Sequence, residues 1–265
     1  MCKRLNKALS AAGILIGFCA AFWPLGLWYG RRLTDGGDEP LGLVVLVLVA
    51  GLAIGNQRQM KDASMPKTSL VFLGLYLLSS FWLPPMLRCI PAILCIAFYF
   101  GWHTRPSWLA LLLLSLPVVA TLQFYLGYPM RVISAETTRW LIWPFVNDIV
   151  RDGSTLSAYG KVVGVDPPCS GVRMLWMGLV YTNLVAAMGQ MSWLKTIAFN
   201  FLAVFLLLIT NSVRSALLFA PESGIIQISE AMHTGAGVIC YLGAILILLR
   251  IAAMEPRSTR VQLIS

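Results

Sequence analysis

One cysteine in this chain stands where a reactive thiol could form. Cys169 directly follows Pro167 and Pro168 and precedes a long apolar run. Proline suits the first turn of a helix, and the free backbone N–H groups of that turn favour an anion, so a thiolate would be stabilised there. Cys169 is therefore a candidate nucleophile, while the alternative is a thiol that only packs, as most single membrane cysteines do.

Two further side chains could assist such a nucleophile. Asn211 and Arg214 lie three residues apart near the end of an apolar run, on one face of the expected helix. An arginine in that place is costly unless it snorkels to the interface or has a partner. His233 opens the next apolar run, and Glu230 could orient its ring or cap the helix. A thiol, a proton donor and a fixed positive charge for an oxyanion form an acyl-transfer set.

The composition indicates that these residues belong to a membrane protein. Of the 265 residues 58% are hydrophobic and 12% are charged, whereas soluble domains have roughly 25% charged residues. The net charge of +9 comes from basic residues between apolar runs, which indicates topology and not nucleic-acid binding. The first apolar run is too long for a cleaved signal peptide. The cysteines form no C-x-x-C pair, so we expect no metal and no cofactor.

We expect an all-α integral membrane protein of about eight transmembrane helices. The second and third are short against the ~20 residues of a usual span. Basic residues near both ends and in alternate loops predict that both termini are cytoplasmic, with Arg31 and Arg32 as the exception. The predicted helices cover residues 8–29, 41–55, 69–83, 85–102, 107–128, 171–191, 194–210 and 231–250.

A polar segment, 129–168, is expected to form a small extracytoplasmic cap between the fifth and sixth helices. Its aromatic residues suit an interfacial helix, Asp152-Gly153 is a turn signal, and "TLSAYGKVVGV" predicts a hairpin. The chain then divides into an N-terminal bundle of about five helices (1–128), the cap (129–168), the helices with the candidate catalytic residues (169–250) and a cytoplasmic tail (251–265).

The pattern of these residues resembles the exosortase and archaeosortase family, and most closely the bacterial exosortases. It consists of Cys169-Ser170-Gly171 at the start of a helix, Asn211 to Arg214 at the end of the next helix, and His233 at the start of the last. Further resemblance extends from about Tyr125 to Arg250. It implies a membrane cysteine transpeptidase in which Cys169 is the nucleophile, Arg214 stabilises the oxyanion and His233 is the general acid or base.

The resemblance also implies the partners and the location. Substrates would be exported proteins with a C-terminal sorting motif, a transmembrane helix and a basic tail. They would be cleaved through a thioester at the outer face of the inner membrane. Ser170, Gly171, Asn211 and Glu230 would support the site, and Arg173 and Asp166, which flank the cysteine, would contact substrate.

Two other functions fit the same residues. A transporter or channel could use Arg214 and Asn211 to line a solute path, and a purely hydrolytic cysteine protease would use the same three groups with water as acceptor. The sorting motif, the acceptor and the oligomeric state are not visible in the sequence.

Overall fold

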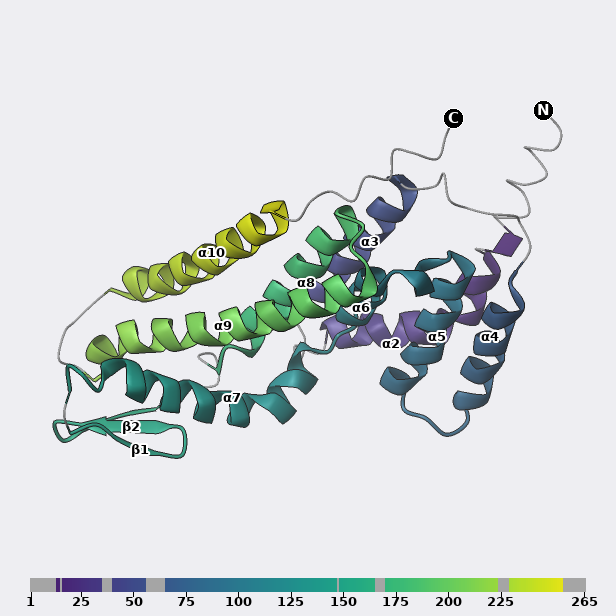
Figure 1. The fold of residues 1–265 in the computed structure, drawn as a ribbon. Helices are drawn as coiled ribbons and strands as arrows, with labels where there is room; N and C mark the ends of the chain where they lie inside the picture. The colour runs from purple at the N-terminus through teal and green to yellow at the C-terminus, as the bar shows by residue number, and fades with distance from the viewer. Residues whose placement is uncertain are drawn as a thin grey trace. The chain divides into compact units, whose positions relative to one another are not determined.

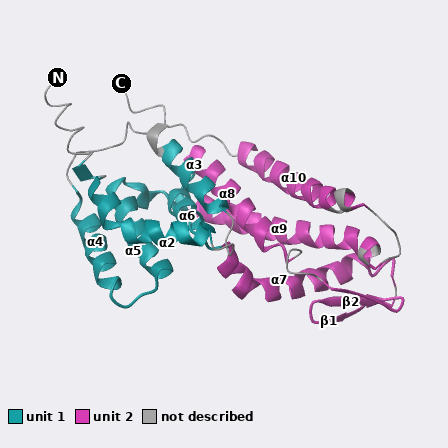
Figure 2. Cartoon of the chain, turned by 180° about the vertical axis from the view of Figure 1, so that it is seen from behind, with its two compact units in different colours: residues 1–118, 191–193 teal, residues 119–190, 194–265 magenta. Residues whose placement is uncertain are grey.

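The computed structural model describes residues 13–14, 16–34, 40–55, 65–146, 148–164, 170–223 and 229–254, and these are mostly helical. The chain forms two compact units, Met1–Val118 with Met191–Trp193 and Val119–Gln190 with Leu194–Ser265 (Figure 2).

Unit 1 is built of short apolar helices. The antiparallel pair α4 and α5 is tied by the Ser69 hydroxyl, which donates to the Cys95 carbonyl at 2.8 Å. Tyr76 packs with Leu25 and its hydroxyl donates to the Ala21 carbonyl at 3.1 Å. The predicted second helix is confirmed with the same bounds. The elements are α2 (Trp23–Thr34), α3 (Leu41–Gly55), α4 (Lys67–Ser79), α5 (Pro85–Tyr99), the 3-10 turn η2 (Trp102–Thr104) and α6 (Pro106–Leu114).

The predicted fifth helix, 107–128, is wrong as a single element. α6 ends at Leu114, and a new helix, α7 (Val119–Ile142), begins after a short break. Pro117 lies in the break, where its ring and its missing N–H oppose helix continuation. Pro129, by contrast, lies inside α7, which continues to Ile142.

Within its described residues, unit 2 combines four helices with a small antiparallel sheet (Figure 1). The strands pair in the order β1-β2-β3, so the predicted hairpin is confirmed as β2 and β3, and β1 adds a third strand. The elements after α7 are β1 (Val150–Asp152), β2 (Thr155–Ala158), β3 (Lys161–Gly164), α8 (Val172–Met188), α9 (Trp193–Glu222) and α10 (Glu230–Met254).

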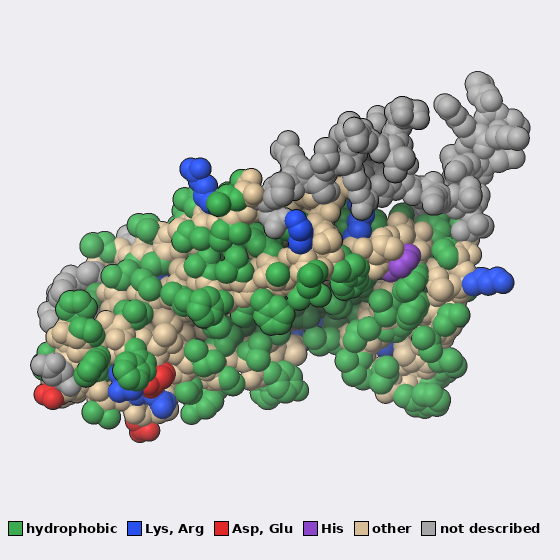
Figure 3. Space-filling model, in the orientation of Figure 1, with side chains coloured by type: hydrophobic (Ala, Val, Ile, Leu, Met, Phe, Trp, Pro, Cys, Tyr) green, Lys and Arg blue, Asp and Glu red, His purple; other side chains and the backbone are tan. Residues whose placement is uncertain are grey.

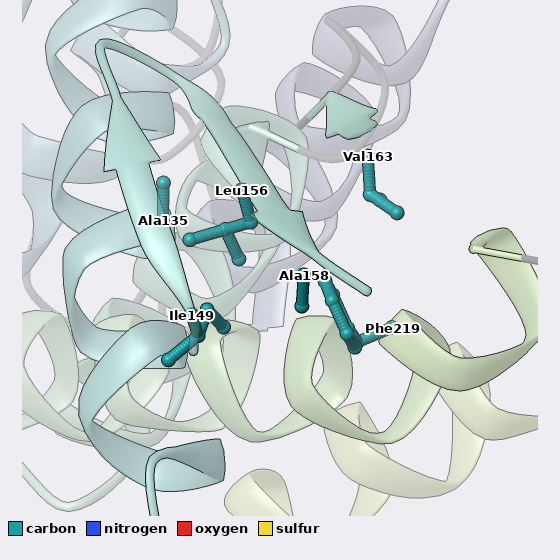
Figure 4. Packing of buried hydrophobic residues seen from close by; sticks show 6 residues of the cluster. All are labelled: Ala135, Ile149, Leu156, Ala158, Val163 and Phe219. Atoms are coloured by element: carbon teal, nitrogen blue, oxygen red, sulfur yellow. The ribbon is translucent and has the colours of Figure 1, made fainter. Parts of the chain in front are cut away.

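One face of the sheet packs against helices. Leu156, Ala158 and Val163 point toward Ala135 of α7 and Phe219 of α9 (Figure 4). Each of these five side chains is 6% exposed or less. The sheet is therefore held in a fixed position at one end of α7 and α9.

Length and apolar composition identify two helical segments of the described chain that can cross a membrane alone, Trp193–Phe219 and Thr234–Met254. α6 and α7 would make a third candidate if they are counted together across their break. Four shorter apolar segments accompany them, Leu41–Leu52, Lys67–Ser79, Pro85–Tyr99 and Val172–Met188. The expected helical membrane protein is thus confirmed, whereas the number of about eight spans stays a prediction, since the described residues give two candidate spans, or three with the α6–α7 pair.

Candidate functional site

The start of α8 is fixed against the Asn211 side chain of α9. Gly171, which caps α8, has φ +81°, and a Cβ atom there would lie 2.7 Å from Asn211 Cγ. Glycine meets both demands because it tolerates positive φ and has no Cβ. Cys169 lies outside the described residues, two positions before Gly171 in the chain. The segment that follows the candidate nucleophile is therefore seated on the Asn-x-x-Arg segment.

A polar seam connects α9 to α7 beneath this contact. Asn211 is 1% exposed, and its Nδ2 donates to Ser134 Oγ at 2.9 Å. One turn along α7, Thr138 Oγ1 donates to the Ser212 carbonyl at 3.3 Å. Buried polar groups are costly unless they are hydrogen-bonded. The bond to Ser134 therefore satisfies a donor of the Asn211 amide group and fixes the orientation of that group.

Ser170 is held in the same way by a residue that the sequence analysis missed. Its hydroxyl is buried, donates to Gln123 Oε1 at 3.1 Å and accepts from the Val172 N–H at 3.4 Å. Gln123 belongs to the first turns of α7, 47 residues before Ser170. Both residues after Cys169 thus have defined partners from distant helices.

Arg214 lies between α9 and α10. Its Nε is shielded from solvent, and a Cβ atom on Gly237 of α10 would lie 3.0 Å from that nitrogen. Position 233 precedes Gly237 by four residues, one turn along the same side of α10. The guanidinium group is therefore packed onto the side of α10 that carries His233. The side chains of His233 and Glu230 lie outside the described part of the structure.

The remaining predicted site residues are more dispersed. Arg173 is exposed on α8, and Asp166 lies outside the described residues. Ser134 and Thr138, four positions apart on one face of α7, were missed, because serine and threonine inside a helix commonly bond only to carbonyl groups of that same helix. Within the described side chains no group of three or more His, Cys, Asp or Glu residues could hold a metal ion.

Charged groups gather where the sheet meets α7. The Glu136 carboxylate accepts from Arg139 Nη2 at 2.7 Å, Arg151 Nε at 2.6 Å and Trp140 Nε1 at 2.8 Å. Figure 3 shows the acidic side chains in view at this end of unit 2, while hydrophobic side chains cover much of the rest of the visible face. This end therefore carries charged groups that favour contact with water.

These features define a helical membrane protein in which Gly171, at the start of α8, and Gly237 of α10 face Asn211 and Arg214 of one turn of α9. The family model for transmembrane exosortases (Exosortase_EpsH) matches residues 12–250, so the chain belongs to the transmembrane exosortase family, as the sequence predicted. Membership implies a membrane protein that processes the PEP-CTERM-like sorting signals of other proteins. A comparison with curated proteins and with solved structures finds no match.

Proposed function

We propose that this protein is a membrane-embedded cysteine transpeptidase that cleaves the C-terminal sorting signals of exported proteins. The Cys169 thiolate attacks the scissile carbonyl carbon, and the Arg214 guanidinium stabilises the resulting oxyanion. The C–N bond then breaks, His233 protonates the departing amine, and the N-terminal part of the substrate remains as a thioester on sulfur. An acceptor amine or water attacks the thioester, His233 takes the proton of the acceptor, and the thiolate leaves.

The observation that carries the proposal is a pair of tight glycine contacts. Gly171 touches Asn211, and Gly237 touches Arg214. Cys169 is two residues before the first glycine and His233 is one turn before the second. Both contacts involve the same turn of α9, so they support a site where the three sequence motifs converge.

The structure also supports a division of labour within that turn. Asn211 is directed to the backbone at Gly171 and to Ser134, so it supports the segment after the nucleophile. Arg214, three residues later, is directed to α10. A planar guanidinium provides several donors in a fixed plane, which suits an oxyanion better than a point charge does. Arg173 and Asp166 remain candidates for substrate contact.

The proposed topology places this site at the outer face of the inner membrane. About eight spans, a cap at 129–168, the helices at 169–250 and cytoplasmic ends account for the basic residues between the apolar runs. The charged end around Glu136 supports an exposed position for the sheet. A reporter that is active only outside the cytoplasm should be active when fused at Tyr159 and inactive when fused after Arg250. The opposite result would place the site on the cytoplasmic side, away from exported substrates.

The catalytic proposal is tested with Cys169→Ala and Cys169→Ser beside Cys19→Ala, a change at an exposed thiol of unit 1. The substrate is a co-expressed exported protein that ends in a sorting signal. Both Cys169 variants should insert at normal levels and leave the substrate uncleaved, whereas Cys19→Ala should behave as the wild type. Normal cleavage by Cys169→Ala would refute the proposal. The mass of the product's C-terminus distinguishes an amine acceptor from water.

A further inference from the structure

β3 has an open outer edge. It is the last strand in the order β1-β2-β3, and no strand within the described residues pairs with its other side. The Val162 side chain is 69% exposed. A Cβ atom on Gly164 would meet only Thr155 Cγ2, at 3.9 Å. Such an edge offers backbone donors and acceptors to an added strand.

The hairpin geometry determines which groups are offered. The turn residues Tyr159 and Gly160 have φ of 52° and 72°, as a two-residue type I′ turn requires. The residues flanking such a turn form a hydrogen-bonded pair, and these pairs recur at every second position. Counted from Lys161, Val162 and Gly164 fall between the pairs. Their N–H and C=O groups therefore point away from β2.

The open edge lies close to two parts of the proposed catalytic site, namely the α9 segment that carries Arg214 and the chain position of Cys169. The Val163 side chain packs in one cluster with Phe219 of α9, which is five residues, or ~7.5 Å of helix axis, beyond Arg214. From Gly164 the chain reaches Cys169 in five residues, so the two lie within ~17 Å of each other. A peptide added to β3 would lie one strand spacing away, about 4.8 Å.

We infer that the outer edge of β3 binds the substrate segment next to the scissile bond as an additional strand. The inference rests on the proposed function and names how that site holds its substrate. A segment that is to be cleaved must be extended so that its carbonyl is accessible, and an extended peptide binds an open sheet edge through main-chain hydrogen bonds. Because α7 and α9 pack against one face of the sheet, the edge of β3 is held in position before the substrate binds, which lowers the entropic cost of binding.

The test uses two substitutions at one position. Val162→Pro removes an N–H that points outward and leaves the pairing with β2 intact, because proline is tolerated on an edge strand in that orientation. Val162→Ala removes the side chain and keeps the N–H. With a synthetic sorting-signal peptide that the wild-type protein cleaves, Val162→Pro should raise KM about threefold to tenfold, the effect of one lost hydrogen bond. Val162→Ala should keep the wild-type KM.

A second measurement needs no protein variant. Peptides methylated at one backbone nitrogen at a time lose one donor each, and a paired strand uses the donors of every second residue. The wild-type protein should therefore lose affinity for alternate members of the series. Equal sensitivity along the peptide, or none, together with a normal KM for Val162→Pro, would overturn the inference. If Cys169→Ala abolishes cleavage in the same assay, the proposed function stands despite that result; if Cys169→Ala still cleaves, the proposed function itself has failed.

Discussion

Gly237 provides a perturbation that separates stability from catalysis. A Cβ atom at this position would lie 3.0 Å from Arg214 Nε, 3.6 Å from Cδ and 3.7 Å from Cζ. Ordinary van der Waals contacts begin at 3.4 Å. The alanine methyl of Gly237→Ala must therefore push the guanidinium away by several tenths of an ångström. The added methyl group would act on the proposed catalytic residues through its contact with Arg214.

Gly237→Ala should affect folding stability and catalytic rate in opposite directions. Alanine favours a helix interior over glycine by roughly 0.5–1 kcal/mol, so the folded protein should be as stable as the wild type or slightly more stable. Catalysis should suffer, because a misplacement of about 1 Å can cost ~10²-fold in rate. For a smaller displacement we expect a loss of about tenfold in turnover, or ~1.4 kcal/mol of transition-state stabilisation.

The matched control is Gly243→Ala in the same helix, where a Cβ atom would meet nothing within 4 Å. Both variants are compared with the wild type by thermal unfolding in detergent and by the initial rate of substrate cleavage. We expect Gly243→Ala to cleave normally and Gly237→Ala to be slow, with neither less stable. If Gly237→Ala cleaves as fast as Gly243→Ala, the placement of Arg214 against α10 has no catalytic importance, and the reasoning is refuted.

Three further substitutions test other contacts. Arg214→Lys keeps the charge and loses the planar donors, so cleavage should fall about 10²–10³-fold at normal membrane abundance, while Arg250→Lys should be neutral; equal activities would leave Arg214 as an interfacial anchor. Asn200→Ala removes the amide that exchanges hydrogen bonds with Asn183 at 2.8 and 3.2 Å. It should lower the unfolding free energy by about 1–2 kcal/mol without changing cleavage by the folded protein, and unchanged thermal stability would contradict this. Gly171→Ala should destabilise by about 2–5 kcal/mol, from strain at positive φ and overpacking, and thermal unfolding in detergent at the wild-type temperature would refute that assignment.

Some elements follow directly from the sequence. The uninterrupted apolar run from Leu41 to Gly55 predicts α3 because a polar face is absent. The hairpin of β2 and β3 follows from β-branched residues punctuated by Gly160 and Gly164. In both cases the local pattern and the tertiary environment favour the same structure.

Prolines show why other boundaries could not be predicted. Pro117 and Pro129 both lie in apolar surroundings, yet the chain leaves the helix near the first and remains helical through the second. A proline removes one helical hydrogen bond, and neighbouring groups decide whether the freed carbonyl is satisfied without breaking the helix. Sequence alone does not reveal those neighbours.

In the candidate site, too, some residues could be predicted from the sequence and others could not. The motif residues around Cys169, Asn211 and His233 were predicted from their types and spacing, whereas their partners were not. Gln123 and Ser134 belong to no motif, and they bind Ser170 and Asn211 across 47 and 77 residues of chain. Such partners are determined by how α7 packs, which no local pattern in the sequence specifies.

The thioester on Cys169 is the central claim, and intact-protein mass spectrometry tests it most directly. Purified protein is mixed with the cleavable sorting-signal peptide, quenched in acid at short times and weighed before and after treatment with hydroxylamine. We predict an adduct with the mass of the N-terminal cleavage product, located on Cys169, lost with hydroxylamine and absent from Cys169→Ala. Cleavage at the normal rate with no adduct at any quench time, or an adduct on another residue, would contradict the account.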